Sequence, residues 1–415
     1  PSYNVLASVG HVRDLPKSRL GIDIENQFEP GYINIRGKGD KIKELKKAAS
    51  SASRILLATD PDREGEAISW HLAYLLDIDP QSECRIVFNE INKEAVKEAI
   101  KHPRSIDMGL VDAQQARRVL DRLVGYQISP LLWQKVRRGL SAGRVQSAAL
   151  KMICDRENEI KSFVPEEYWT ITAEYGDNFN ASLSKYNGED IRVTTAEEAD
   201  TIENQLNAGK FVVESVKTGK RKPKPYAPFT TSSLQQDASI KLNFQTKKTM
   251  QIAQQLYEGI EVKGIGTRGL ITYLRTDSVR ISSAAKEAAS EFITNKFGRE
   301  YSSNNSFSNK NKDIQDAHEA IRPTDVNLEP ETIRDSLTSD QFKLYTLVWN
   351  RFVASQMAAA EFDTVTVIID NNGYEFRSSG SRLVFDGWRR VYPIANEKDS
   401  YVPELKKGDE LNCIE

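Results

Sequence analysis

The sequence contains few of the residues that mark secreted, zinc-binding or membrane-spanning proteins. Only three cysteines occur in its 415 residues, Cys84, Cys154 and Cys413, and none forms a CxxC pair, so neither a disulfide framework nor a zinc site is indicated. No apolar run approaches the roughly 18 residues of a membrane span, and no signal peptide opens the chain. These absences favour a globular protein of a reducing, intracellular compartment.

The composition and length indicate several folded domains. Hydrophobic residues make up 39% and charged residues 28% of the chain, as in globular proteins. A single core usually serves about 100 to 200 residues, so the length predicts about two to four domains. Because the first residue is Pro1, in mid-pattern, we expect a segment of a longer protein.

Positive charge is unevenly distributed, although the net charge is only −2. No Asp or Glu occurs between Arg122 and Cys154, where arginines and lysines recur, and residues 215–236 form a second acid-free, lysine-rich stretch. Basic stripes in a near-neutral protein suggest a polyanionic partner. The alternative is that they are solvated faces, which are often basic.

The hydrophobic pattern changes along the chain. The first hundred residues alternate strand-like and helix-like pieces such as "RILLATD" and "EGEAISWHLAYLL", which predicts an α/β layer with a mainly parallel sheet. From Asp107 the pattern turns helical, with breaks at "SPLLW" and at the turn 139–143. It becomes β-like from Glu167 and again after residue 360, around a long helical insert. Within the insert, Ser232 and Gln235 have capping-box spacing.

The stretch "ATDPDREGEAI" places Asp60, Asp62 and Glu64 at alternate positions, directly after an apolar strand and before a helix. In open α/β sheets, ligands bind at this end of the strands. Carboxylate oxygens without nearby His or Cys suit Mg²⁺, which retains most of its waters and bridges to phosphate. The cluster therefore indicates a magnesium site or, alternatively, an ordinary acidic loop whose carboxylates favour the helix dipole.

The stretch "QQARRVLDRLVGY" is rich in arginine at helical spacing. Arg117 and Asp121 are four residues apart, as are Arg118 and Arg122 beside them. Such residues form surface salt bridges or turn guanidinium groups toward a phosphate backbone. The turn "RRGLSAGRVQS" follows, with glycines that let backbone amides approach an anion. The helix after this turn opens with Arg144 and Gln146.

The stretch "GLITYLRTDS" places Tyr273 two residues before Arg275. A phenol, with an ordinary pKa of about 10, is a poor nucleophile at neutral pH unless nearby cations stabilise its anion, which Arg275 could do. Tyrosines in apolar stretches are commonly core residues instead. The stretch "DAHEAIRP" holds His318, one of four histidines, beside Glu319 and Arg322. It is either structural or part of a polar catalytic surround.

Taken in order, "SVGHVRDLP", "ATDPDREGEA", "AQQARRVLDRLVGY", "GRVQS", "FTTSSLQQDAS", "GLITYLRTDS" and "DAHEAIRP" resemble the motifs of bacterial DNA topoisomerase I, of the type IA family, over essentially the whole chain. "YLRTDS" with "AHEAIRPT" is more similar to topoisomerase I than to topoisomerase III. The resemblance implies a multidomain fold of α/β, α and β parts in a toroidal arrangement. Its parts would be a TOPRIM (Rossmann-like) domain at 1–105, a helical DNA-binding domain at 106–163, a β-rich hinge domain at 164–228 and 360–415, and a helical domain at 229–359 that carries the tyrosine.

The same resemblance implies an ATP-independent enzyme that relaxes negative supercoils. Tyr273 would attack a backbone phosphate of single-stranded DNA and form a 5′-phosphotyrosyl link, and the free 3′-OH would reverse the reaction after strand passage. Because the phosphotyrosyl ester conserves the bond energy, no ATP is needed, and the chain has no GxxxxGKS/T loop. We expect a Mg²⁺-dependent monomer in the cytoplasm, associated with the bacterial nucleoid and with no membrane.

The resemblance also carries roles to single residues. Metal binding falls to Asp60, Asp62 and Glu64, and catalysis to Tyr273, Arg275 and His318. The DNA-binding residues would be His11, Arg117, Arg118, Asp121, Arg122, Tyr126, Ser141, Gly143, Arg144 and Gln146. Phosphate contacts of this kind should make binding fall steeply with salt.

The chain departs from the family pattern at its ends. Family members begin with a strand that ends in a Glu-Ser-Pro-x-Lys motif, which serves acid-base, metal and phosphate chemistry, and this sequence starts after it; a later helical segment and cysteine-rich zinc modules are also missing. We therefore expect the segment to bind single strands but to cleave them poorly. Two other functions stay open: a TOPRIM-type metal-dependent nuclease or primase-like enzyme, and a non-catalytic single-strand-binding scaffold.

Overall fold

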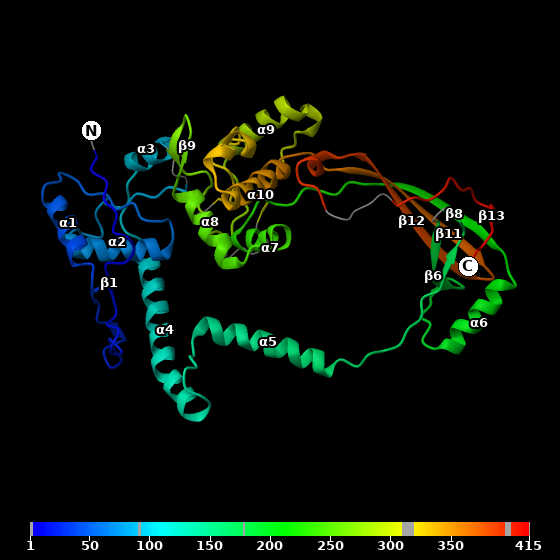
Figure 1. The fold of residues 1–415 in the computed structure, drawn as a ribbon, viewed down its shortest axis with the longest axis horizontal. Helices are drawn as coiled ribbons and strands as arrows, with labels where there is room; N and C mark the ends of the chain where they lie inside the picture. Colours follow the sequence, from blue (N-terminus) through cyan, green and yellow to red (C-terminus); the bar gives the residue numbers. More distant parts are fainter. Residues whose placement is uncertain (1–2, 90–92, 177–178, 309–318, 395–399, 415) are drawn as a thin grey trace. The chain divides into compact units, whose positions relative to one another are not determined.

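The computed structural model describes residues 3–89, 93–176, 179–308, 319–394 and 400–414. The chain separates into two units, Pro1–Phe163 and Val164–Glu415. The first unit consists of helices and very short strands, and the second of a long antiparallel sheet and a helical part (Figure 1). Within the described ranges, no helix is both long and apolar enough to cross a membrane.

The first unit contains the helices α1 (Gly39–Ser50), α2 (Arg63–Leu76) and α3 (Lys93–Lys101). α2 begins after Asp62, whose carboxylate accepts the Gly65 N–H at 2.8 Å and so caps the helix. One face of α2 packs into an apolar core that it shares with α1 and the segments around it. The buried residues of this core are Val12, Ile42, Leu57, Leu72, Ala73, Cys84, Ile106 and Val111.

The mainly parallel sheet expected for the first unit is reduced, among the described residues, to one parallel bridge between Leu57 and Arg85. Beside this bridge, the Arg85 side chain donates to the carbonyls of Thr59 and Asp60, each at 2.8 Å. Arg85 also forms an isolated antiparallel bridge with Arg104, and the remaining pairings are antiparallel and two residues long. They join β1 (Arg13–Asp14) to β4 (Ile33–Asn34) and β2 (Ile22–Asp23) to β3 (Glu29–Pro30).

A long helix, α4 (Met108–Lys135), packs against α2. We expected a break at "SPLLW", but the helix continues through Pro130. Although proline removes one N–H donor, the turn after it is closed by the Val136 N–H, which bonds to the Leu132 carbonyl at 2.9 Å. The next helix, α5 (Arg144–Ser162), has no buried residue.

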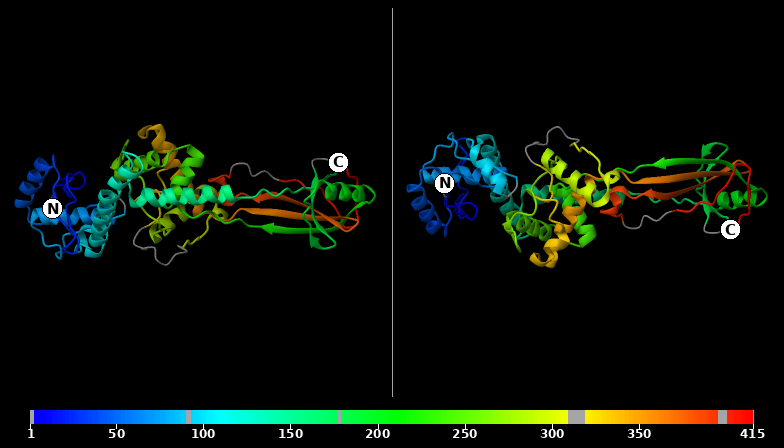
Figure 2. Two further views of the ribbon diagram at one scale, coloured as in Figure 1. Left: turned by 90° about the horizontal axis from the view of Figure 1, so that it is seen from below. Right: turned by 90° about the horizontal axis from the view of Figure 1, so that it is seen from above.

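The second unit is built on a seven-stranded antiparallel sheet with the order β13-β8-β11-β12-β6-β5, in which β7 pairs with β6. β11 and β12 form a hairpin whose turn residues, Asn372 and Gly373, have φ of 56° and 86°, the positive values that a tight two-residue turn requires. In Figure 2 the long strands β8, β11 and β12 lie side by side, with α6 (Ala196–Asn207) at one end, where Ile202 and Leu206 enter the core of the sheet. The strands are β5 (Thr172–Glu174), β6 (Asn180–Tyr186), β7 (Glu189–Asp190), β8 (Phe211–Arg221), β11 (Glu361–Asn371), β12 (Tyr374–Phe385) and β13 (Glu410–Leu411).

The helical part of the second unit lies between β8 and β11 in the chain. Its first capping box is formed by Thr230 and Ser233, two residues earlier than expected. The helix starts earlier because the Thr231 N–H bonds to the Thr276 carbonyl at 2.8 Å, which fixes the chain at that point. The elements are α7 (Thr231–Leu242), α8 (Thr246–Glu258), β9 (Ile260–Val262), β10 (Gly266–Arg268), α9 (Ser283–Phe297) and α10 (Ser339–Ser355), with 3₁₀ turns at Arg299–Tyr301 and Pro330–Ser336. A further 3₁₀ turn, Gly387–Arg390, follows β12.

Candidate functional site

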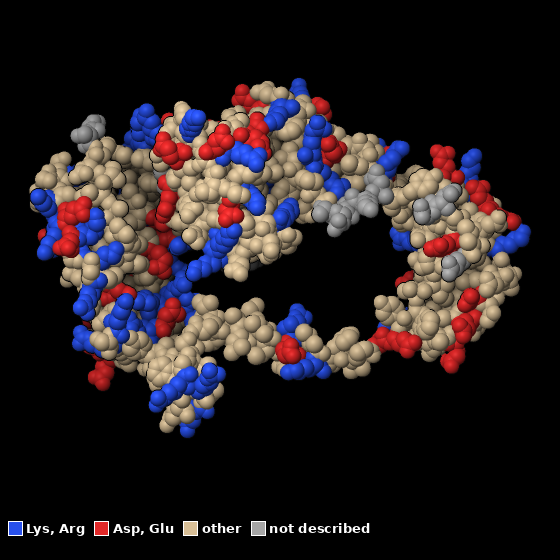
Figure 3. Space-filling view, viewed as in Figure 1, with Lys and Arg blue, Asp and Glu red and all other residues tan. Residues whose placement is uncertain are grey.

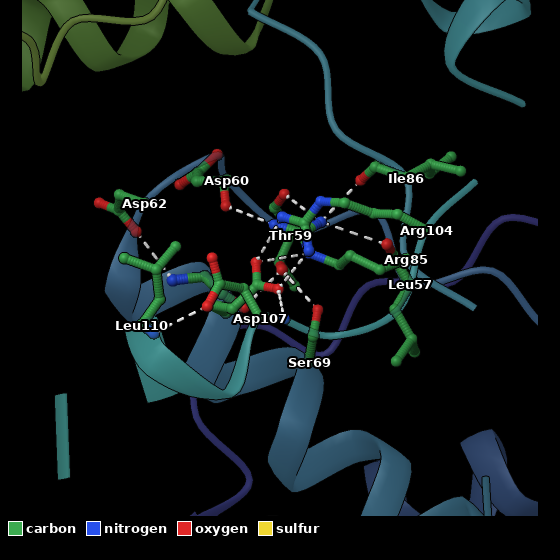
Figure 4. Close-up of polar contacts among 12 residues, drawn as sticks. Leu57, Thr59, Asp60, Asp62, Ser69, Arg85, Ile86, Arg104, Asp107 and Leu110 are labelled. Carbon is green, nitrogen blue, oxygen red and sulfur yellow. Dashed lines mark hydrogen bonds and ion pairs between the residues drawn. The ribbon is translucent and has the colours of Figure 1, made fainter. Parts of the chain in front are cut away.

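A buried arginine fixes the loop that carries Asp60 and Asp62. The Arg85 side chain has no exposed surface, and its guanidinium donates to the carbonyls of Leu57 at 3.2 Å and of Thr59 and Asp60 at 2.8 Å (Figure 4). These carbonyls belong to the end of the apolar segment and the start of the acidic loop. The loop is therefore held through its backbone, and the Asp62 carboxylate caps α2.

Glu66 supplies the negative charge that this arginine requires. Its carboxylate, 1% exposed, accepts from Arg85 Nε at 3.0 Å, from Arg104 Nη1 at 2.7 Å and from the Asp107 N–H at 2.7 Å. Burial alone would raise the pKa of Glu66, but the hydrogen bonds from Arg104, Asp107 and Arg85 outweigh it and lower the pKa. One buried carboxylate thus ties α2 to the segment at Arg85 and to the start of α4.

Gly65 has a steric role at the start of α2. A Cβ at this position would lie 2.1 Å from the Asp60 carbonyl oxygen, closer than any side chain permits. Only glycine lets the helix begin this close to the acidic loop. The N-terminus of α2, which attracts anions through its free N–H groups, therefore lies beside Asp60 and Asp62.

Glu64, the third acidic residue, contacts other partners. Its Oε2 lies 3.3 Å from His11 Nε2 and accepts from Gln114 Nε2 at 3.2 Å. The His11 contact is the main cause that lowers the pKa of Glu64 to about 2. No group of three or more His, Cys, Asp and Glu side chains in the described part of the chain is arranged to hold a metal ion. The oxygen donors suit a hard cation, but only Asp60 and Asp62 share one loop, so metal binding by all three residues stays a prediction.

A cavity of about 370 Å³ opens beside Glu64. On its wall the Arg118 guanidinium holds Asp14 with a two-pronged contact, Nη2 to Oδ2 at 2.6 Å and Nε to Oδ1 at 2.9 Å. Arg117 and Asp121, predicted as a pair, are 3.9 Å apart. The lining residues are His11, Arg13, Asp14, Tyr32, Glu64, His71, Gln114, Arg117, Arg118 and Asp121.

Arg122 and Tyr126 form a contact further along α4. Arg122 Nη1 donates to the Tyr126 hydroxyl at 2.6 Å, and its guanidinium lies 4.7 Å from the centre of the Tyr126 ring. That hydroxyl donates to the Lys17 carbonyl at 2.6 Å. The ring itself stays 40% exposed, so it can stack with a nucleobase.

The predicted residues Ser141, Gly143, Arg144 and Gln146 gather at the start of α5. Gln146 Nε2 donates to Ser141 Oγ at 3.2 Å across this helix terminus. Arg144 Nε donates to Asp121 at 3.1 Å and so ties the turn to α4. Figure 3 shows basic side chains gathered at the turn between α4 and α5. Its exposed basic residues include Lys135, Arg137 and Arg138.

In the second unit, the backbone on both sides of Tyr273 is fixed by separate segments. The Thr272 N–H bonds to the Arg322 carbonyl at 2.9 Å, and Thr231 Oγ1 donates to the Leu274 carbonyl at 2.7 Å. The Tyr273 ring is 2% exposed and meets the ring of Tyr257 edge to face, with centres 5.4 Å apart. Tyr273 is thus held in one position.

The residues near Tyr273 differ in exposure. Arg275 is exposed, two residues beyond the buried tyrosine. Arg322 is 3% exposed and pairs with Glu319 at 2.8 Å, so these neighbours of His318 form an internal ion pair. His318 lies outside the described residues, and its catalytic role stays a prediction.

Sequence reasoning missed several polar residues that line the cavity or support the acidic loop. Gln114, which bonds to Glu64, lies three residues before Arg117, so helical spacing could have indicated it. Three of the others lie in the motifs "SVGHVRDLP" and "ATDPDREGEA", but no local pattern indicated their role, because burial of a polar group depends on distant segments. They are Arg13, Asp14, Tyr32, Glu66, His71, Arg85 and Arg104.

Comparisons with known proteins account for nearly the whole chain. A family model described as Toprim domain matches residues 2–91, and one described as DNA topoisomerase matches residues 105–415. Full-length topoisomerase I from Thermotoga maritima has a similar structure, with 44% sequence identity and a TM-score of 0.87. The match covers 99% of this chain and 67% of the Thermotoga chain.

Glu66→Ala should lower the free energy of unfolding of the first unit by about 3 to 5 kcal/mol, because Arg85 is left buried without its carboxylate. Urea unfolding followed by tryptophan fluorescence measures the change. As a control, Glu98→Ala removes a side chain that is 60% exposed and should leave the midpoint unchanged. Equal midpoints for the two variants would contradict a central role for Glu66.

Glu64 should make the first unit acid-sensitive in metal-free buffer. Its pKa falls from an ordinary value of 4.5 to about 2 on folding, so its stabilising contribution is complete above pH 4.5 and is lost as the pH falls toward 2. The melting temperature of the wild type should therefore exceed that of Glu64→Gln at pH 6, and the difference should shrink by pH 3. A difference that is constant with pH would contradict this.

Proposed function

Since the chain belongs to the type IA DNA topoisomerases, within the group of bacterial topoisomerase I, we propose that Tyr273 is the residue that it joins to a DNA strand. The resemblance of the ordered motifs and the multidomain mixed α/β fold are confirmed by these matches. The enzyme is an isomerase that breaks and rejoins DNA without ATP and relaxes negative supercoils. The Toprim match is part of this assignment, so a separate nuclease or primase function is not favoured.

The observation that carries the proposal is the fixed position of Tyr273. The backbone on either side of it is held by two hydrogen bonds, one to the Arg322 carbonyl and one from the Thr231 hydroxyl. A nucleophile needs such a fixed position, because it must approach the phosphorus atom in line with the bond that breaks. The exposed Arg275 follows two residues later and supplies positive charge for the phosphate oxygens. We assign His318 to the same phosphate from the family motif alone.

The chemistry at Tyr273 is a transesterification. Its phenolic oxygen attacks a backbone phosphorus, the bond from phosphorus to the 3′ oxygen breaks, and that oxygen leaves as a 3′-OH with one proton. Attack by the 3′-OH reverses the step and frees the tyrosine. Because one phosphodiester bond replaces another, no external energy is used, which supports the assignment of Tyr273 as a covalent nucleophile.

The Toprim match implies a divalent metal in general, and we infer that it is Mg²⁺. Asp60 and Asp62 would hold it from their shared loop, which Arg85 fixes through the backbone. Glu64 would join them if it left His11 and Gln114. When bound, the ion would neutralise charge on a DNA phosphate.

DNA is the substrate of this family, and we assign its single-stranded track to α4 and the turn after it. Arg117, Arg118 and Arg122 would contact the strand, with Asp121 orienting Arg117 and Arg144. The partly exposed ring of Tyr126 suits base stacking. The further residues of the track are His11, Ser141, Gly143 and Gln146.

The domain assignment at 1–105, 106–163, 164–228 with 360–415, and 229–359 is part of this proposal. The change from helices to sheet after α5 and the helical part between β8 and β11 support it. We propose a monomer, because each role proposed above falls to a residue of this one chain. We place it at the bacterial nucleoid, because DNA is the substrate of the family.

Tyr273→Phe, in the protein that contains these 415 residues, should abolish the covalent DNA adduct, because the nucleophilic oxygen is gone. Denaturing gels of labelled single-stranded DNA after incubation with Mg²⁺ detect the adduct. Tyr345→Phe removes another buried hydroxyl of the same unit, one that bonds to the Leu328 carbonyl at 2.7 Å, and should keep the adduct. An adduct that persists in Tyr273→Phe rules out the assignment.

Asp60→Asn combined with Asp62→Asn should weaken Mg²⁺ binding at least about tenfold, because both charged donors are lost. Calorimetric titration with Mg²⁺ measures this without DNA. Asp40→Asn removes an exposed carboxylate from the first turn of α1 and should leave the affinity unchanged. Equal affinities of the double variant and the wild type would place the metal elsewhere.

A further inference from the structure

The lining of the cavity includes a buried cation without an anionic partner among the described residues. Arg13 is 9% exposed, and its guanidinium lies 3.7 Å from the centre of the Tyr74 ring and 5.8 Å from that of Tyr32. Within the described residues it forms no ion pair, and its Nη1 is buried without a hydrogen-bond partner. Burial lowers the pKa of Arg13 from its ordinary value. Because an unpaired buried charge is strongly unfavourable, such a site calls for an anion.

Two neutral groups with unused hydrogen-bonding capacity accompany this arginine. The Tyr32 hydroxyl and His71 Nδ1 are buried without partners among the described residues, and both side chains line the same cavity. The two rings meet edge to face with centres 4.6 Å apart. Burial raises the pKa of Tyr32 to about 12 and lowers that of His71 to about 3, so at neutral pH the phenol keeps its proton and the imidazole is uncharged. Each can donate one hydrogen bond.

The carboxylates on the cavity wall do not neutralise Arg13, because each already has other partners. Asp14 is held by Arg118 at 2.6 Å, and Asp121 accepts from Arg144 at 3.1 Å. The third carboxylate, Glu64, contacts His11 and Gln114, as described above. Among the described residues, the positive charge of Arg13 therefore remains uncompensated.

We propose that this cavity is a phosphate subsite, in which Arg13, the Tyr32 hydroxyl and the His71 Nδ1–H bind the oxygens of one phosphate group. Phosphate oxygens only accept hydrogen bonds, and the site offers one charged and two neutral donors to match. The phosphate comes from a DNA strand or is a free ion. Binding of a DNA phosphate rests on the proposed function, whereas binding of a free phosphate ion does not.

The test measures binding in EDTA, where no cleavage occurs, by fluorescence anisotropy of a labelled single-stranded oligonucleotide. Arg13→Met should weaken binding about 10- to 100-fold, because a charge-assisted contact is lost. Arg54→Met removes an exposed arginine of the same unit that does not line the cavity, so binding should change less than about threefold. Equal losses in the two variants would exclude a DNA phosphate as the ligand and leave only the free ion.

Two further arms identify the ligand. A strand with an abasic stretch keeps its phosphates, so Arg13→Met should weaken the binding of this strand as much as that of the natural strand. If Arg13→Met weakened the binding of the natural strand only, the ligand of Arg13 would be a nucleobase, and the proposal would be overturned. Inorganic phosphate that raises the melting temperature of the wild type, but not of Arg13→Met, would identify the free ion as a ligand as well. If Arg13→Met changes neither the binding of the strand nor the stabilisation by inorganic phosphate, the subsite does not exist.

The melting temperature of the unliganded variant shows whether Arg13→Met still folds. Removal of an uncompensated buried charge should leave the melting temperature of unliganded Arg13→Met equal to or above that of the wild type. If it falls instead, Tyr32→Phe, which keeps the ring, decides: a loss of about three- to tenfold in affinity supports the subsite, and unchanged affinity overturns it. The covalent adduct at Tyr273 is a different measurement, so failure of the subsite leaves the proposed nucleophile untouched.

Discussion

The buried contact between Glu66 and Arg85 is the interaction on which the first unit depends. Arg85 bonds to backbone carbonyls of the acidic loop, and it can be buried only because Glu66 neutralises it. Breaking such a pair leaves a charge in the core, which is why removal of one partner is far more damaging than removal of a surface pair. The position of Asp60 is thus a consequence of an ion pair that contacts no substrate.

In the second unit, neutral groups fix the backbone of the segment that carries Tyr273. The Thr231 hydroxyl donates to the Leu274 carbonyl on one side of Tyr273, and the Thr272 N–H donates to the Arg322 carbonyl on the other. These bonds need no buried counter-ion, so they leave the positive charge of Arg275 at the surface. In both units, a chain segment that carries chemistry is held by its backbone. A fixed backbone limits the positions that the side chains of such a segment can take.

Much of the local structure and part of the candidate site could be predicted from the sequence. The order of the motifs indicated the family, and helical spacing placed Arg117, Arg118 and Asp121 on one helix. Local patterns were less reliable at boundaries. The break expected at Pro130 did not occur, and the capping box of α7 lies two residues earlier than its spacing suggested. The earlier start of α7 comes from a bond between Thr231 and the distant Thr276, which a short window of sequence does not contain.

The sequence by itself determined the residue types at the site and their order along the chain: carboxylates on one loop, arginines on one helix and a tyrosine next to an arginine. Only the tertiary structure decided which polar groups are buried and which of them lack partners. Arg13, Tyr32 and His71 come from three separate segments, and no periodicity relates them. Burial and pairing depend on which segments pack together. The phosphate subsite could therefore be seen only after folding had brought these side chains to one cavity.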